Sequence, residues 1–299
     1  MIGTLRIFLP GPLLLVALLV AGSAEAEPVN IDGLIVTEGG VSWTFIIFDA
    51  VRDLPPSPAL QNVVAVRDAV LLNPPKEDAF DGSWEVSVGG FLVRLQPGLN
   101  GDRVIDPTGT TVTAATTTVA GLNVTLQFFM SRDLPVLRVL VILQNPGPSG
   151  VTVQVALLGD LGSDGDTLVV EPSASGDAGL TDADRWVISS DATLSDPVIG
   201  TVVFGPGGPA VRSRAATLVE DRFSVSYSVR VPPGTTRRVM GFSQLSADPA
   251  AARTAITFFD TNEALTAAGL LSGLDAQAQA EIVNWTLGFP TVCADRTGC

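Results

Sequence analysis

The sequence contains no histidine, and this absence removes several kinds of active site. Without an imidazole there is no Ser-His-Asp or Cys-His nucleophile, no His-ligated zinc or haem, and no histidine proton shuttle. Positive charge is also scarce, because 17 Lys and Arg residues stand against 31 Asp and Glu residues, for a net charge of −14. Nucleic-acid phosphates and anionic lipid surfaces repel such a polyanion, so neither is an expected partner.

Long apolar runs are confined to the first residues of the chain. Residues 1–26 have the form of a secretory signal peptide, with Arg6 as the charge of its first part, an apolar stretch over Leu13–Ala21 and a cleavage site at Ala24-Glu25-Ala26. The apolar stretch is too short to cross about 30 Å of hydrocarbon. We therefore expect an exported protein, periplasmic or extracellular, with no membrane span after cleavage.

Cysteine is limited to Cys293 and Cys299, near the end of the chain. Export would place both where disulfides persist, and two cysteines allow a single intramolecular pairing, so the sequence predicts a Cys293–Cys299 disulfide. The alternatives are free thiols in a frayed tail and pairing with another molecule.

Most of the remaining chain alternates apolar and polar residues, which is typical of strands with one buried face. Residues 223–231 alternate at every position, and residues 123–128 and 151–155 follow the same pattern. Residues 136–143 are apolar almost throughout, which indicates a strand covered on both faces. With short turns between them, segments 123–128, 136–143 and 151–155 predict a three-stranded meander.

Two Gly-Gly pairs, Gly39-Gly40 and Gly89-Gly90, each separate two alternating segments. Glycine tolerates positive φ at both central positions of a type I′ turn, so each pair predicts a two-residue hairpin.

Helical signals appear only after the last predicted strand. Asp248, followed by proline, predicts a helix over 250–259, and Asp275 predicts another from Ala276 to Trp285. The fold class that follows is all-β, a large two-sheet antiparallel sandwich with a short C-terminal helical segment. The expected divisions are a signal peptide (1–26), the β-sandwich domain (27–246), C-terminal helices packed on the sandwich (247–287) and a short tail with the cysteine pair (288–299).

The densest acidic cluster, Asp160, Asp164 and Asp166, has two interpretations. Ca²⁺ takes six to eight oxygen ligands from carboxylates and carbonyls, so these residues are a candidate calcium site, although their spacing differs from that of an EF-hand. The other interpretation, which we favour, is a solvated β-turn in which Asp and Gly accept unusual backbone angles. No other cofactor is expected.

A ligand site is a weaker prediction at Asp184, Arg185 and Trp186. All four tryptophans share a face with apolar neighbours and are expected in the core, but the two charges beside Trp186 give it a polar rim. Arg185 is expected to pair with a nearby carboxylate rather than with a ligand. A glycosidase needs two carboxylic acids and no histidine, so that class of enzyme stays open.

Several segments carry a family resemblance, and they are Leu137–Leu140 leading to Asn145, Gly159–Thr167, Asp184–Trp186, Pro233–Arg237, Gly269–Leu274 and Ile282–Trp285. They resemble segments of uncharacterised exported bacterial β-sandwich proteins. The chain is also similar, in strand order, to the supersandwich of galactose mutarotases, which is found beside glycoside hydrolase catalytic domains as well. This resemblance implies the two-sheet sandwich, but the mutarotase histidine has no counterpart here.

The function expected from the sequence is an exported, non-catalytic binding or envelope-structural role, with carbohydrate or an envelope component as partner. The alternative is a carbohydrate-active enzyme or accessory domain that uses paired carboxylates.

Overall fold

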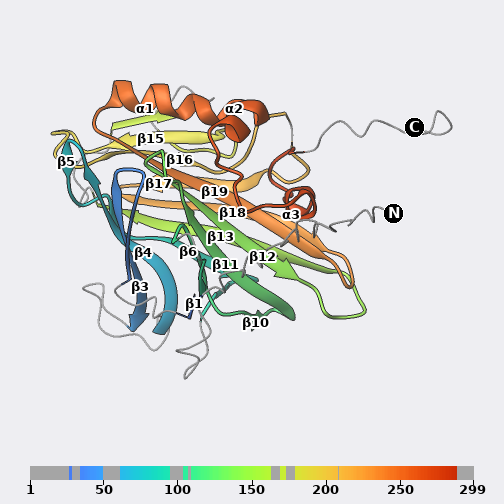
Figure 1. Ribbon diagram of the computed structural model, residues 1–299. Coiled ribbons are helices and arrows are strands. Elements are labelled where there is room, and N and C mark those ends of the chain that lie inside the picture. The colour runs from blue at the N-terminus through green and yellow to red at the C-terminus, as the bar shows by residue number, and fades with distance from the viewer. Residues whose placement is uncertain are drawn as a thin grey trace, which may run out of the picture.

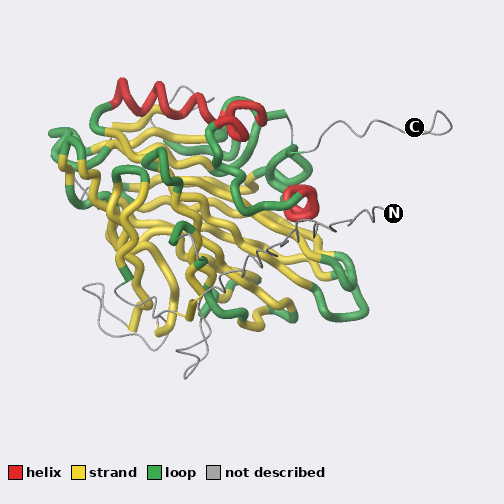
Figure 2. Tube along the Cα trace, in the orientation of Figure 1, coloured by secondary structure: helices red, strands yellow, loops and turns green. Residues whose placement is uncertain are grey.

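The chain folds into two antiparallel β-sheets packed face to face, with helices on one side (Figures 1 and 2). The computed structural model describes residues 27–28, 34–49, 61–94, 104–106, 109–162, 169–172, 179–207 and 209–287. The predicted signal peptide and both cysteines therefore lie outside the described residues. No helix within these ranges is long and apolar enough to cross a membrane.

Ten of the described strands form one sheet. Their order is β1 (Glu27–Pro28), β8 (Val104–Ile105), β9 (Thr111–Thr113), β11 (Leu122–Met130), β12 (Val136–Gln144), β19 (Thr236–Ser246), β16 (Val198–Val202), β15 (Trp186–Ser190) and β14 (Val169–Pro172), and β10 (Thr117–Val119) also pairs with β11.

Nine described strands form the second sheet. Their order is β17 (Ser213–Val219), β18 (Arg222–Val231), β13 (Val151–Leu161), β6 (Phe80–Val88), β4 (Gln61–Leu72), β3 (Val41–Asp49) and β2 (Ile35–Glu38), while β5 (Pro75–Lys76) pairs with β4 and β7 (Phe91–Leu92) with β6. The predicted all-β, two-sheet antiparallel sandwich is confirmed.

Both predicted Gly-Gly hairpins are present. Gly39 (φ 60°) and Gly40 (φ 77°) join β2 to β3, and Gly89 (φ 62°) and Gly90 (φ 83°) join β6 to β7. Positive φ at both central residues is the type I′ geometry that glycine permits.

The predicted meander is correct for two strands and wrong for the third. Strands β11 and β12 pair as expected, but β13 belongs to the opposite sheet, where it pairs with β18 and β6. The connection after Asn145 carries the chain between the sheets. The Asn145 side chain donates hydrogen bonds to the carbonyls of Ser149 (2.8 Å) and Val231 (3.0 Å), and its backbone carbonyl accepts from Gly234 N–H (2.9 Å). One buried amide thus joins the β12–β13 crossover to the β18–β19 crossover.

The main core lies between the sheets and is rich in aromatic residues. Phe45 packs edge-on against Phe128, with ring centroids 5.3 Å apart, and Trp84 packs edge-on against Phe223, with ring centroids 5.4 Å apart. Trp84 also donates its indole N–H to Ser243 Oγ of the facing sheet at 2.8 Å. Trp43, Trp84 and Trp285 are buried and Trp186 is half-buried, so the expectation that the tryptophans belong to cores is confirmed.

A helical segment covers the outer face of the ten-stranded sheet. It contains α1 (Pro249–Ala255), a 3₁₀ turn η2 (Ile256–Phe259), α2 (Asn262–Ala267) and α3 (Ala276–Glu281). Both predicted N-caps are confirmed, because Asp248 accepts from Ala251 N–H (2.8 Å) and Asp275 from Ala278 N–H (2.7 Å). Figure 1 shows α1 running over β15 and β16.

The second predicted helix is shorter than the sequence suggests. It ends at Glu281, and Ile282 is extended (ψ 121°). The side chain of Asn284 accepts from Met240 N–H (2.9 Å) and donates to Met240 O (2.7 Å), so residues 282–285 run along β19 instead of continuing the helix. Ile282 and Trp285 are still buried as predicted.

The helical cover explains why β12 is apolar on both faces. Leu137, Val139 and Val141 belong to the core between the sheets, whereas Val136 and Leu140 belong to a second core beneath the helices. This prediction from the sequence is confirmed, since both faces of the strand are removed from water.

Candidate binding groove

A groove of about 330 Å³ lies on the outer face of the nine-stranded sheet, away from the helices. Residues from four neighbouring strands line it, and one of them is a glycine. The lining residues are Glu85 of β6, Leu158 and Gly159 of β13, Thr217 and Val219 of β17, and Arg222, Phe223 and Ser224 of β18.

Strand register brings four of these residues into one row. Thr217 faces Ser224, Ser224 faces Leu158, and Leu158 faces Glu85. Ser224, Leu158 and Glu85 have buried residues as their neighbours along the strand, and the neighbours of Thr217 are partly buried against the core, so all four side chains project from the outer face. The row therefore presents two hydroxyls, an apolar side chain and a carboxylate side by side.

A β-bulge places Glu85 in this row. Leu158 pairs with Glu85 and Gly159 with Ser83, so Trp84 is an extra residue in β6. Trp84 has a φ of 64°, a left-handed conformation that is unusual for a large side chain, and its indole is fixed in the core by Ser243. Bulges are common beside functional sites, where they redirect side chains. The bulge buries Ser83 and Trp84 together and leaves Glu85 half-exposed.

Gly159 is required for the packing beneath the groove. A Cβ atom at this position would lie 2.0 Å from Phe223 Cε1 and 2.3 Å from Ser83 Oγ. Any larger residue would displace the Phe223 ring, which is itself part of the lining. The groove therefore depends on glycine at 159 and on the bulge opposite it.

Arg222 is held at one end of the groove by carboxylates. Its Nε lies 3.2 Å from Asp160 Oδ2 and 3.9 Å from Asp221 Oδ1. The side chain of Asp160 is only 4% exposed, whereas that of Arg222 is 64% exposed. The buried carboxylate thus fixes the base of a guanidinium whose far end is in solvent.

Of the three aspartates of the predicted calcium site, Asp160 lies within the described residues. This residue is the penultimate residue of β13 rather than part of a loop, and it binds Arg222. Asp164 and Asp166 lie outside the described residues. Within the described part of the chain, no group of three or more acidic or cysteine side chains could hold a metal ion. Calcium binding by the three aspartates stays a prediction.

The other predicted ligand residues have structural contacts. Asp184 is fully buried and accepts hydrogen bonds from Thr181 N–H (2.9 Å) and Thr181 Oγ1 (2.7 Å). Arg185 forms an ion pair with Asp260 at 2.6 Å, so the expected carboxylate partner is present. Trp186 packs beside the second core, beneath the helices. The structure does not bring these residues to the groove.

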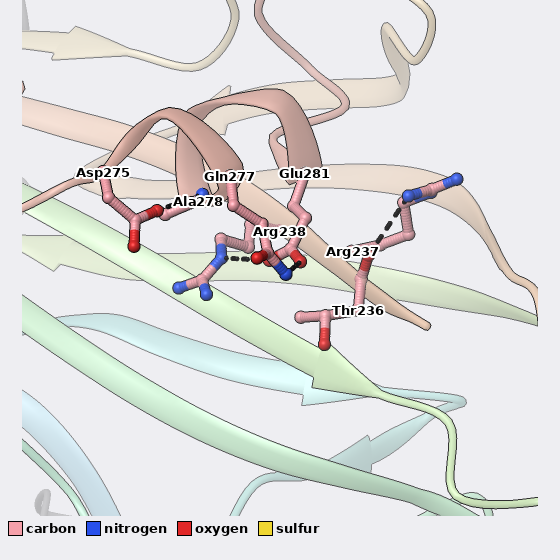
Figure 3. A network of polar contacts seen from close by, with 7 residues as sticks. All are labelled: Thr236, Arg237, Arg238, Asp275, Gln277, Ala278 and Glu281. Atoms are coloured by element: carbon pink, nitrogen blue, oxygen red, sulfur yellow. Dashed lines mark hydrogen bonds and ion pairs between the residues drawn. The ribbon is translucent and has the colours of Figure 1, made fainter. Parts of the chain in front are cut away.

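Two further polar clusters attach the helical segment to its sheet. Figure 3 shows that Arg238 of β19 bonds to Glu281 of α3 (2.9 Å), which also accepts from Gln277 (3.0 Å). Arg138 of β12 is 1% exposed and donates to the carbonyls of Leu270 (2.7 Å) and Ser272 (3.0 Å). Burial, together with the charge of Arg238, lowers the pKa of Arg138 to about 9, so it remains a buried cation at neutral pH.

Sequence reasoning missed the groove residues Glu85, Thr217, Arg222 and Ser224. The alternating segment before Gly89-Gly90 and residues 223–231 predict two of the four strands. Alternation shows which residues face outward, but strand pairing decides which outward residues become neighbours.

Comparisons with known proteins give a likeness of fold. No protein-family model matches the chain, and no curated protein sequence matches it. Among solved structures, 97 chains match. A polysaccharide lyase is 14% identical, with a TM-score of 0.43, over 74% of this chain and 35% of the lyase.

Two other solved structures match over almost their whole length. The Slr1438 protein from Synechocystis is 10% identical, with a TM-score of 0.45, over 75% of this chain and 99% of its own. A galactose mutarotase-like protein from Lactobacillus casei is 10% identical, with a TM-score of 0.40, over 71% and 99%. The structural neighbours thus include galactose mutarotase-like proteins, as the resemblance implied, and no activity follows for this chain.

Proposed function

We propose that this protein is an exported, non-catalytic carbohydrate-binding protein and that the groove on the nine-stranded sheet is its binding site. The mixed lining of the groove is the observation that carries this proposal. A sugar ring presents hydroxyls around its edge and C–H groups on its faces. Thr217, Ser224 and Arg222 offer polar contacts, and Leu158 and Val219 offer apolar ones.

The size of the groove fits a small ligand segment. Its volume of about 330 Å³ lies at the low end of the roughly 300–1,000 Å³ that small-molecule sites occupy. Among the lining residues Phe223 is the aromatic one, and it is 2% exposed, so a sugar cannot stack on its face. Binding would therefore rest on hydrogen bonds and would be weak for a single ring.

The charged groups of the groove favour binding over hydrolysis. Glycosidases place two carboxyl groups on either side of the scissile bond. Glu85 is the one carboxylate among the described lining residues, and Asp160 beside the groove is buried and bonded to Arg222. This distribution supports a binding role rather than the alternative enzyme with paired carboxylates.

The test is calorimetric titration of the mature protein with cellohexaose, xylohexaose and mannohexaose. We expect at least one to bind, and we expect Ser224→Phe to weaken binding about tenfold or more by filling the groove, a loss of about 1.4 kcal/mol. Ser228→Phe is the matched control, because Ser228 lies on the same strand and face but does not line the groove. Equal binding by both variants, or none by wild type, would contradict the proposal. Release of shorter sugars would favour the enzyme alternative.

A further inference from the structure

Arg222, the cationic residue among the described residues that line the groove, has acidic neighbours. Asp160 and Asp221 both lie within 4 Å of Arg222 Nε, and Glu85 is a third acidic group in the same region. The two aspartate side chains are 4% and 12% exposed, so solvent screens them less than it screens Arg222. The described residues of the groove therefore offer no surplus of positive charge.

We infer that the groove selects uncharged glycans over acidic ones, and that Asp160 and Asp221 determine this selectivity by neutralising Arg222. The inference rests on the proposed function, because it concerns the ligand of the same groove. A uronate carboxylate entering beside Arg222 would meet the guanidinium and both aspartates together. Its attraction to one charge would be offset by repulsion from two.

The way in which Arg222 is held also suits an uncharged ligand. The ion pair with Asp160 uses Nε, and no described residue bonds to the two terminal amino groups. Those groups are donors in a fixed planar arrangement, and they can reach sugar hydroxyls without requiring a charged acceptor. Asp160 thus acts as a positioning residue, and the exposed end of Arg222 makes the contact.

The experiment compares neutral with acidic hexasaccharides in wild type and in Asp221→Asn. Cellohexaose, xylohexaose and mannohexaose represent the neutral glycans, and hexagalacturonate and hexaguluronate represent the acidic ones. We expect wild type to bind its best neutral ligand about tenfold more tightly than either acidic one. In Asp221→Asn the ratio of acidic to neutral binding should rise about threefold to tenfold. This rise should shrink in high salt.

Glu263→Gln is the matched control, because it also removes one negative charge. Glu263 is exposed on α2, on the outer face of the other sheet. We expect this variant to keep the wild-type ratio of neutral to acidic binding. Melting curves of all three proteins verify that each is folded.

Each result has a distinct meaning. Wild type that binds acidic glycans as tightly as neutral ones would overturn the inference and leave the proposed function intact. An unchanged ratio in Asp221→Asn, or the same change in Glu263→Gln, would overturn the role of Asp221. Failure of every glycan to bind would overturn the proposed function and the inference with it.

Discussion

The two sheets of this protein differ in what their outer faces carry. On the ten-stranded sheet Val136, Leu140 and Phe242 face outward and are buried under the helical segment. On the nine-stranded sheet the outward residues of β18 are Ser224, Ser226 and Ser228, all half-exposed. The comparison shows one sandwich with a face covered by helices and a face of half-exposed polar residues, on which we propose the binding site. Hydrophobic area buried on the first face supports the fold, and small polar residues on the second leave room for a ligand.

The largest expected effect tests the helix-covered face. Phe242 is fully buried, and its ring centroid lies 5.0 Å from that of Phe259 and 5.3 Å from that of Trp285. Phe242→Ala should lower the free energy of unfolding by about 3–5 kcal/mol, because it leaves a cavity beneath the helices. Ser226→Ala on the opposite face should change it by less than about 0.5 kcal/mol. Urea denaturation measures both, and equal effects would remove the distinction between the faces.

An intermediate effect is expected at the buried cation beneath the helices. Arg138→Met should lower the free energy of unfolding by about 1–3 kcal/mol, because the carbonyls of Leu270 and Ser272 lose their donor. Arg230→Met removes the same charge from an exposed position on β18 and should have little effect. If Arg138→Met were as stable as wild type, burying the charge would cost as much as its hydrogen bonds contribute.

The smallest effect is expected in the β15–β16 loop, which contacts both sheets. Lys76 of β5 donates to the carbonyls of Leu194 and Asp196. Asp191 lies in the same loop, and its burial by itself raises the pKa of its carboxyl group. Hydrogen bonds from Thr193, Ser195 and Asp196 outweigh this effect and hold the pKa below its usual value.

Asp191→Asn should therefore lower the free energy of unfolding by about 1–2 kcal/mol at pH 7. A carboxylate with a lowered folded pKa contributes stability above its unfolded pKa, about 3.9, and that contribution is lost as the pH falls through the folded value. The difference in unfolding free energy between wild type and Asp191→Asn should therefore shrink as the pH is lowered. A difference that grows at low pH would contradict this prediction. The control Asp182→Asn, at an exposed carboxylate, should have nearly the same free energy of unfolding as wild type at pH 7.

Features that depend on neighbouring residues in the chain could be predicted from the sequence. The hairpin at Gly39-Gly40 needs two residues with positive φ, and the caps at Asp248 and Asp275 need one side chain within three residues of its partner. The apolar run of β12 indicated two covered faces because each face is read from alternate positions.

Features that depend on partners far along the chain could not. The period of β13 is the same in either sheet, so it did not reveal the crossover after Asn145. The groove joins Glu85 to Arg222 through a bulge at Trp84, which alternation does not show. In the sequence Asp160 belongs to an acidic cluster, but in the structure it pairs with a guanidinium from the neighbouring strand.

Hydrogen exchange with and without bound sugar tests most directly the claim that the groove face binds the ligand. The protein is incubated with a saturating mixture of cellohexaose, xylohexaose and mannohexaose, and amide exchange is followed by mass spectrometry of its peptides. We predict slower exchange in residues 213–231, which form β17 and β18, and no change in residues 249–287 of the helical segment. Protection confined to 249–287 would place the ligand on the other face and contradict the account.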